Sequence, residues 1–188
     1  GVHRRLTAKG VTRLLPTLKG EHLLEESIDG PEYRLYVVAG RSIAAFRREP
    51  ANVVGDGRQT LAMLIEQKQA QRALHPGYRN VPLPATTHLE AFLAQDGRTL
   101  EEVPAQGESV MLSDIPSNHA GGESVDVTDT LAASVKAVAE RTQQVMGLPF
   151  AGLDLIVSAS GTPNERIVVL EANQNPYIKL DALAFPGV

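Results

Sequence analysis

Apolar and polar residues alternate along residues 150–176, FAGLDLIVSASGTPNERIVVLEANQNP, in two arms that flank a turn-rich middle. Such alternation, interrupted by Ser, Gly, Thr, Pro and Asn, is typical of a β-hairpin. If the turn is centred in the middle segment, Asp154 faces Glu171, and Asn173 lies two residues further along the same face. The pattern therefore predicts two carboxylates beside an amide on the polar face of a hairpin.

Two opposed carboxylates need a physical reason, because like charges that face each other across a sheet are destabilising. A divalent cation supplies one: Mg²⁺ takes one or two protein carboxylates together with phosphate oxygens, and an Asn carbonyl can complete the set. In the alternative interpretation both acids lie on a solvated face and never meet. The spacing alone leaves both interpretations open.

A second alternating stretch, residues 32–48, predicts another hairpin around a tight Gly-Arg turn. Glu32 and Arg34 share one face of its first strand. Of Arg47 and Arg48 in its second strand, only one can point towards that same face, because successive side chains alternate. This hairpin therefore brings an acid and two arginines to one side of a sheet.

The remaining elements follow from periodicity and from capping residues. We expect strands over His22–Ile28 and Ser109–Leu112, and helices over Thr60–Ala73, His88–Gln95 and Asp129–Met146, the last ending at Gly147. The loops over residues 75–84 and 113–124 are rich in Gly, Pro and Asn, so they are candidates for substrate-facing segments.

Composition narrows the class of protein. At 188 residues and 43% hydrophobic, the chain suits one domain or two small lobes. It has no cysteine, which excludes disulfides, a thiolate nucleophile and a cysteine zinc site. We find no apolar run long enough for a membrane span and no signal peptide, and so expect a cytoplasmic protein.

Charge argues against a nucleic-acid partner, since the net charge is −4. The first twenty residues are basic and contain no acid, but no aromatic side chain interleaves with them to stack on bases. We favour two other interpretations of these basic residues: they face the phosphates of a nucleotide, or they lie on a solvated helix face.

Several motifs together identify a family. The segment LLEESIDGPEYRLYVVAGRSIAAFRREPANVVGDGRQT, then GGESVDVTD, AGLDLIV and LEANQNP, resembles the ATP-grasp carboxylate–amine ligases. The branch it is most similar to contains the bifunctional glutathione, cyanophycin and N-acetylglutaminylglutamine synthetases. The resemblance implies an α+β ATP-grasp fold, with residues 1–48 in a small lobe, residues 49–188 in a large lobe that carries the 150–176 hairpin, and ATP between them.

The resemblance also implies residue roles. Glu25 corresponds to a hinge acid that faces the adenine amino group, the backbone near Ile28 to the reader of the ring edge, and Glu32 to the acid that holds the ribose. Glu26 is implied to contact the nucleotide as well. Asp154, Glu171 and Asn173 correspond to the ligands of Mg²⁺, or of Mn²⁺. Arg34, together with Arg47 or Arg48, corresponds to the cations that hold the transferred phosphoryl group. Cross-strand surface ion pairs are the alternative for Glu25, Glu26, Arg34 and Arg47.

The implied chemistry is amide formation from a carboxylate and an amine through an acyl phosphate, with amino acids or peptides as substrates. The substrate candidates are Asn118, Gly121, Gly122 and Lys179. A left-handed turn is the alternative for the two glycines, and an exposed lysine for Lys179. The sequence does not decide whether the protein forms a homo-oligomer.

Two departures from the family pattern limit this assignment. The two phosphate-binding lysines of the family have no convincing counterpart in Lys9 or Lys19, and Gly1-Val2 resembles the end of the family's glycine-rich loop, as if the chain were a portion of a longer polypeptide. Gly152 stands where D-alanine ligases place an arginine, so that duty would fall on another arginine. A noncatalytic nucleotide-binding or assembly module with the same fold is therefore the alternative function.

Overall fold

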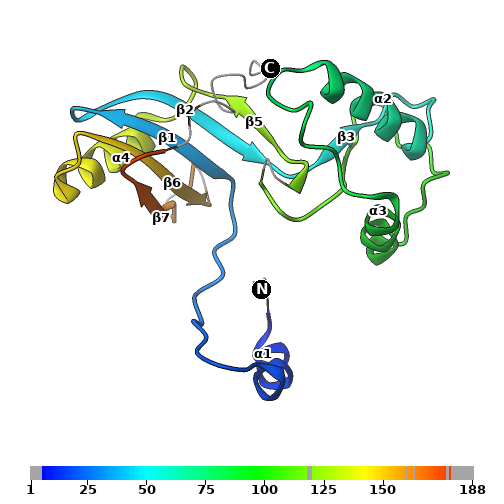
Figure 1. Ribbon diagram of the computed structural model, residues 1–188, viewed down its shortest axis with the longest axis horizontal. Helices are drawn as coiled ribbons and strands as arrows, with labels where there is room; N and C mark the ends of the chain where they lie inside the picture. Colours follow the sequence, from blue (N-terminus) through cyan, green and yellow to red (C-terminus); the bar gives the residue numbers. More distant parts are fainter. Residues whose placement is uncertain (1–5, 118–119, 160, 163, 177, 179–188) are drawn as a thin grey trace.

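A five-stranded antiparallel sheet and a smaller helical part with a two-stranded sheet make up the computed structural model, which describes residues 6–117, 120–159, 161–162, 164–176 and 178 (Figure 1). The strand order of the large sheet is β5-β2-β1-β6-β7, and β3 pairs with β4 in the small one. The strands are β1 Glu32–Val38, β2 Arg41–Glu49, β3 Asn52–Val54, β4 Ser109–Met111, β5 Glu123–Asp126, β6 Phe150–Ser158 and β7 Arg166–Asn173. The α-helices are α1 Ala8–Leu14, α2 Leu61–Leu74, α3 Thr86–Leu93 and α4 Ala133–Met146, with 3-10 turns η1 Leu15–Thr17 and η2 Ala94–Asp96.

The β1–β2 hairpin predicted from alternation is confirmed, but its turn lies at Ala39-Gly40, one residue before the predicted Gly40-Arg41. Its turn residues Ala39 and Gly40 both have positive φ, 47° and 77°. Turns of this hand match the right-handed twist of the two strands that they join. The register pairs Glu32 with Arg48 and Arg34 with Phe46.

The β6–β7 hairpin also has the predicted register, with Asp154 paired with Glu171. Alternation missed a β-bulge here: Leu155 pairs with Val169, so Leu170 is an extra residue on β7 and is half exposed. A bulge shifts side-chain parity by one. As a result Ile167 packs against the core, whereas uninterrupted alternation would place Val168 there.

Helix α4 covers one face of the large sheet (Figure 1). The core between them contains Leu35, Ala45, Leu153 and Leu155 from the sheet and Ala139 from the helix, all fully buried. The helix begins at Ala133, four residues later than predicted, because the preceding residues form turns. It ends as predicted at Gly147, whose φ of 66° suits a glycine.

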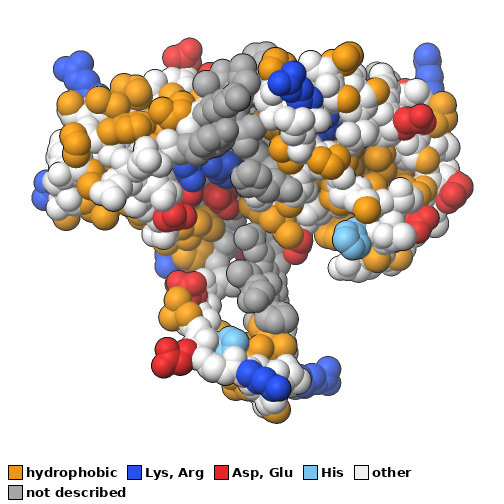
Figure 2. Space-filling model, in the orientation of Figure 1, with side chains coloured by type: hydrophobic (Ala, Val, Ile, Leu, Met, Phe, Trp, Pro, Cys, Tyr) orange, Lys and Arg blue, Asp and Glu red, His pale blue; other side chains and the backbone are white. Residues whose placement is uncertain are grey.

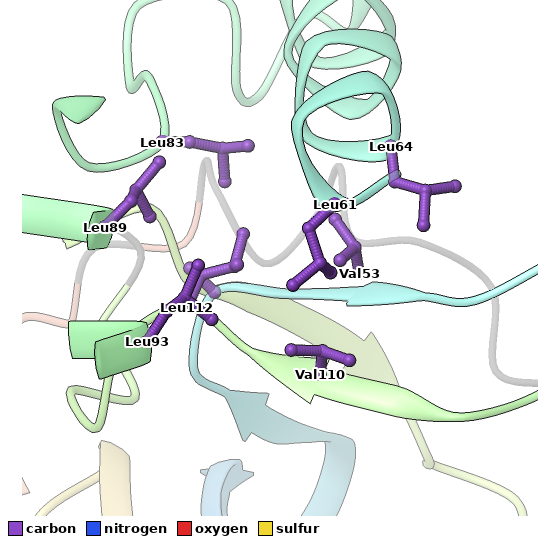
Figure 3. Close-up of a cluster of buried hydrophobic side chains, with 9 residues drawn as sticks. Val53, Leu61, Leu64, Leu83, Leu89, Leu93, Val110 and Leu112 are labelled. Carbon is purple, nitrogen blue, oxygen red and sulfur yellow. The ribbon is translucent and has the colours of Figure 1, made fainter. Parts of the chain in front are cut away.

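A second core lies in the smaller part, where β3, β4, α2 and α3 meet (Figure 3). Its buried side chains are Ala51, Val53, Leu61, Leu64, Leu83, Leu89, Leu93, Val110 and Leu112. Helix α2 starts after Thr60, whose hydroxyl accepts the Met63 N–H at 3.3 Å, as a Thr N-cap should. Both helices and the β4 strand lie within two residues of their predicted bounds. No helix in the described part of the chain has the length and apolar character needed to cross a bilayer.

Two expectations for the first fifty residues are wrong. Residues 22–28 are not a strand: Leu23 and Leu24 are 81% and 73% exposed, and among the described residues no strand lies beside them to share hydrogen bonds. The strands of residues 32–49 do not face the 150–176 hairpin across a cleft but pair with it, since β1 bonds to both β2 and β6. Residues 32–48 therefore do not belong to a lobe separate from the 150–176 hairpin, and the rest of the predicted division into lobes stays a prediction.

Candidate functional site

The face of the large sheet opposite α4, here called the polar face, gathers most of the predicted site. Strand pairing sets Arg34 beside Asp154, Asp154 beside Glu171, and Glu32 beside Arg48. Leu35 and Leu153 are buried against α4. Because successive side chains of a strand point to opposite faces, the charged residues next to them lie on the other face of the sheet. The predicted residues that the polar face brings together are Glu32, Arg34, Arg48, Asp154, Glu171 and Asn173.

The centre of the polar face is a bidentate ion pair between Arg34 and Asp154. Nε and Nη2 of Arg34 donate to the two carboxylate oxygens, the second bond measuring 2.6 Å. Nε of Arg48 lies 3.9 Å from the same carboxylate and 3.9 Å from that of Glu32. The side chains of Arg34, Arg48 and Asp154 are only 10 to 14% exposed, so water screens these charges weakly. Figure 2 shows basic and acidic side chains gathered near the middle of the molecule.

Gly152 explains how the Arg34 guanidinium fits. A Cβ on residue 152 would lie 2.5 Å from Cβ of Pro176 and 3.3 Å from Nη1 of Arg34. There is consequently no room for a side chain at this position. Arg34 reaches the space beside it from the adjacent strand.

Arg47 lies on the other face of the sheet. It pairs with Tyr33, which packs against the α4 core, and its guanidinium contacts Glu49 at 2.5 Å. Alternation allowed only one of the two neighbouring arginines onto the polar face, and the structure selects Arg48. The prediction of a phosphoryl role for Arg47 is therefore corrected.

The nucleotide candidates before β1 lie in irregular chain. Glu26 binds Arg166 at 2.8 and 3.1 Å, and both side chains are more than half exposed. The hydrogen bond from Arg166, then its charge, lowers the pKa of Glu26. A surface ion pair was the alternative for Glu26, although its partner Arg166 was not predicted. Glu25 is exposed and Ile28 half-buried, and their nucleotide role stays a prediction.

The two glycines of the substrate loop make close backbone contacts. A Cβ on Gly121, whose φ is 85°, would lie 2.9 Å from Cδ of Pro84, and one on Gly122 would lie 2.6 Å from the Glu49 carbonyl oxygen. A left-handed turn with close packing explains Gly121, and close packing explains Gly122, while a substrate role for either stays a prediction. The other two substrate candidates, Asn118 and Lys179, lie outside the described residues.

The two predicted substrate-facing loops meet at one pocket of about 410 Å³. Pro82, Leu83 and Pro84 line it from the first loop, and Ser113, Ile115 and Ala120 from the second, with His88 and Phe92 of α3 and Leu112. The lining is largely apolar. Sequence spacing predicted the loops but not that they share a pocket.

A buried charge network was missed by the sequence analysis. Nη1 of Arg72 contacts Glu123 at 2.9 Å, Nζ of Lys68 contacts the other Glu123 oxygen at 3.0 Å, and Arg72 stacks on the Tyr78 ring. Arg72 is 1% exposed. The available signal was Lys68, which falls at helical spacing in the apolar stripe of α2 together with Leu61 and Leu64.

The polar face fits a hard divalent cation in the type of its donors. Asp154 and Glu171 are adjacent carboxylates, and Asn173 adds an amide oxygen on the same strand as Glu171. No cluster of three or more His, Asp or Glu side chains able to hold a metal occurs within the described ranges. A cation here would thus complete its coordination with ligand oxygens, as Mg²⁺ commonly does with phosphate.

Comparison with known proteins gives consistent relatives. No family model matches the chain. It is 34% identical over 174 residues to the glutathione biosynthesis bifunctional protein GshAB of Streptococcus mutans, across 88% of this chain and 23% of that protein. The protein of the same description from Mannheimia succiniciproducens is 31% identical over 194 residues, across 100% of this chain and 26% of the relative.

A solved structure agrees. The crystal structure of a bifunctional glutathione synthetase from Pasteurella multocida matches with a TM-score of 0.72 and 31% identity, covering 87% of this chain and 23% of the other. The chain spans about a quarter of the length of the relatives that it matches. It is therefore a homologue of part of the bifunctional glutathione synthetases and has the fold of the ATP-grasp carboxylate–amine ligases.

Proposed function

We propose that this chain carries the phosphate- and metal-binding surface of an ATP-dependent ligase that joins a carboxylate to an amine. The observation that carries the proposal is the register of β1, β6 and β7, which sets Arg34, Asp154 and Glu171 in one row on the polar face. Homology to the bifunctional glutathione synthetases supports the same chemistry. The nucleotide is proposed to lie against the polar face, with its base towards the segment that leads into β1.

In the proposed reaction the substrate carboxylate attacks the γ-phosphate of ATP, and the amine displaces phosphate from the resulting acyl phosphate. Phosphoryl transfer is accelerated chiefly by positioning and by neutralising charge on the phosphate oxygens. Arg34 and Arg48 supply two poorly hydrated positive charges for this purpose, because their side chains are 11% and 14% exposed. Mg²⁺, which Asp154, Glu171 and Asn173 would hold, supplies charge neutralisation when bound.

The nucleotide base and ribose are assigned to the segment that leads into β1. Glu25 and the backbone near Ile28 would meet the adenine, and Glu32, at the start of β1, would hold the ribose hydroxyls. Glu32 is well placed for this, because it shares the polar face with the arginines. Glu26 is not part of this assignment, since Arg166 binds its carboxylate.

Amino acids or peptides are the proposed substrates, and the pocket between residues 82–84 and 112–120 is the proposed recognition site. Its loop leads directly into β5, where Ser124 pairs with Arg48. A loop that lines the pocket therefore continues into a strand that pairs with the polar-face strand β2. Close backbone contacts at Gly121 and Gly122 hold this loop in place.

The test is ADP release by the protein from the complete reading frame, with Mg²⁺ and a panel of amino acids and γ-glutamyl dipeptides. We expect release to require both an acid and an amine, and Glu171→Ala to lower it by roughly 100-fold or more, because a metal carboxylate is lost. Glu165→Ala, in the turn of the same hairpin, should retain activity. Folded protein that releases no ADP with any pair would favour a noncatalytic module.

A further inference from the structure

We propose that Arg34 is a positioning residue that closes the Asp154 carboxylate to a free divalent cation, so that cation binding depends on a bound polyphosphate nucleotide. The inference rests on the proposed function, because it assigns the cation to Asp154 and Glu171. What it adds is an order of events on the polar face. Nucleotide phosphates must come with the cation or before it.

The geometry gives Asp154 little capacity for a cation that arrives alone. Both of its oxygens accept hydrogen bonds from Arg34, in the planar bidentate arrangement that arginine makes with carboxylates. Arg48 stands 3.9 Å from the same group. With side chains only 10 to 14% exposed, the repulsion between these two guanidinium groups and an incoming cation is weakly screened.

Arg34 is also confined where it stands. The Cβ position of residue 152 lies 3.3 Å from its Nη1 and 2.5 Å from Cβ of Pro176, so the guanidinium lies in a closely packed region as well as against a charged partner. Release of Asp154 therefore needs a competing anion for Arg34. A polyphosphate provides several anionic oxygens in the geometry that guanidinium groups prefer.

The exchange couples the two ligands. Phosphate oxygens that take over Arg34 and Arg48 leave Asp154 with an uncompensated charge, and that charge attracts the cation to Asp154 and Glu171. By linkage, nucleotide raises cation affinity by the same factor as cation raises nucleotide affinity.

The test measures Mn²⁺ binding to the complete protein from the free-Mn²⁺ electron paramagnetic resonance signal, with and without a nonhydrolysable ATP analogue. We expect the wild type to bind Mn²⁺ weakly alone, and Arg34→Gln to raise the nucleotide-free affinity by about tenfold or more. Arg47→Gln is the matched control: it removes the same charge from a neighbouring strand, but on the other face, and should change nothing.

A wild type that binds Mn²⁺ equally well with and without the analogue would overturn the proposal, as would an Arg34→Gln variant with unchanged nucleotide-free affinity. If that variant does not fold, Arg48→Gln tests the same repulsion and should give a smaller rise. The readout is separate from catalysis. If the protein releases ADP but the analogue does not change its Mn²⁺ affinity, the ligase proposal holds and this inference is wrong. If the analogue raises Mn²⁺ affinity but no ADP is released, this inference holds and the ligase proposal is wrong.

Discussion

Position 152 shows how one absent side chain shapes the polar face. Gly152 has no positive φ that would demand glycine, so its requirement is steric: the Cβ site is shared by Pro176 and by Nη1 of Arg34. Pro176, at 2.5 Å, is the neighbour that requires a glycine there, and the arginine that arrives from β1 is a second close neighbour at 3.3 Å. A residue that lacks a side chain thus determines where a charged group of another strand can lie.

We expect Gly152→Ala to reduce the free energy of unfolding by about 1 to 3 kcal/mol, because an added methyl overpacks a filled space. Urea unfolding followed by circular dichroism measures this. Gly10→Ala is the control: its Cβ meets Leu6 at 3.4 Å, an ordinary contact, within a helix that alanine favours. Equal unfolding midpoints for Gly152→Ala and wild type would show that Pro176 moves aside freely.

At the scale of elements, the charge network on Glu123 fastens α2 to the edge of the large sheet. Glu123 begins β5, and the next residue, Ser124, pairs with Arg48 and donates its N–H to the Tyr78 hydroxyl at 3.0 Å. One strand therefore joins the polar face on one side to the α2 helix on the other. Arg72 and Lys68 are what hold it to that helix.

Removing Arg72 should be costly, since it leaves the Glu123 carboxylate buried with one cation instead of two. For Arg72→Ala we expect a loss of about 3 to 5 kcal/mol in unfolding free energy, the range for breaking a buried ion pair. Arg166→Ala breaks an ion pair whose partners are both more than half exposed, and it should hardly change the urea midpoint. Similar effects of the two variants would contradict a structural role for the network.

For the whole molecule, the shifted carboxyl groups predict acid sensitivity. A hydrogen bond from Arg98, then one from a backbone N–H, lowers the pKa of Glu108, Arg166 lowers that of Glu26, and backbone N–H groups lower that of Asp56. A carboxyl whose folded pKa lies below its unfolded value stabilises the fold above the unfolded pKa, and this contribution disappears as pH falls through the folded pKa.

We therefore expect the urea midpoint to be steady near neutral pH and to fall as pH drops below about 4.5, the ordinary value for Glu. Urea titrations at a series of pH values between about 7 and 3 measure the profile. Glu108→Gln should lower the midpoint at neutral pH and flatten its decline in acid, because that carboxyl no longer titrates. A midpoint that rises on acidification would contradict the assignment.

The sequence by itself determined most of the local elements and indicated the protein family. Alternation and turn residues predicted both hairpins, but they left open whether Asp154 and Glu171 meet, which the register of the structure shows. Capping residues predicted the start of α2 and the end of α4. These features depend on neighbours within a few residues or across one turn. Family motifs then indicated the ATP-grasp fold, which the relatives confirm.

Only the tertiary structure decided which residues of different hairpins meet. Pairing of β1 with β6 placed Arg34 on Asp154. Packing of one sheet face against α4 put Arg48 and not Arg47 on the polar face, and residues 22–28 have no strand partner among the described residues. The physical reason is that pairing between distant strands depends on which faces α4 buries together. The periodicity within one strand does not indicate which distant strand it will pair with.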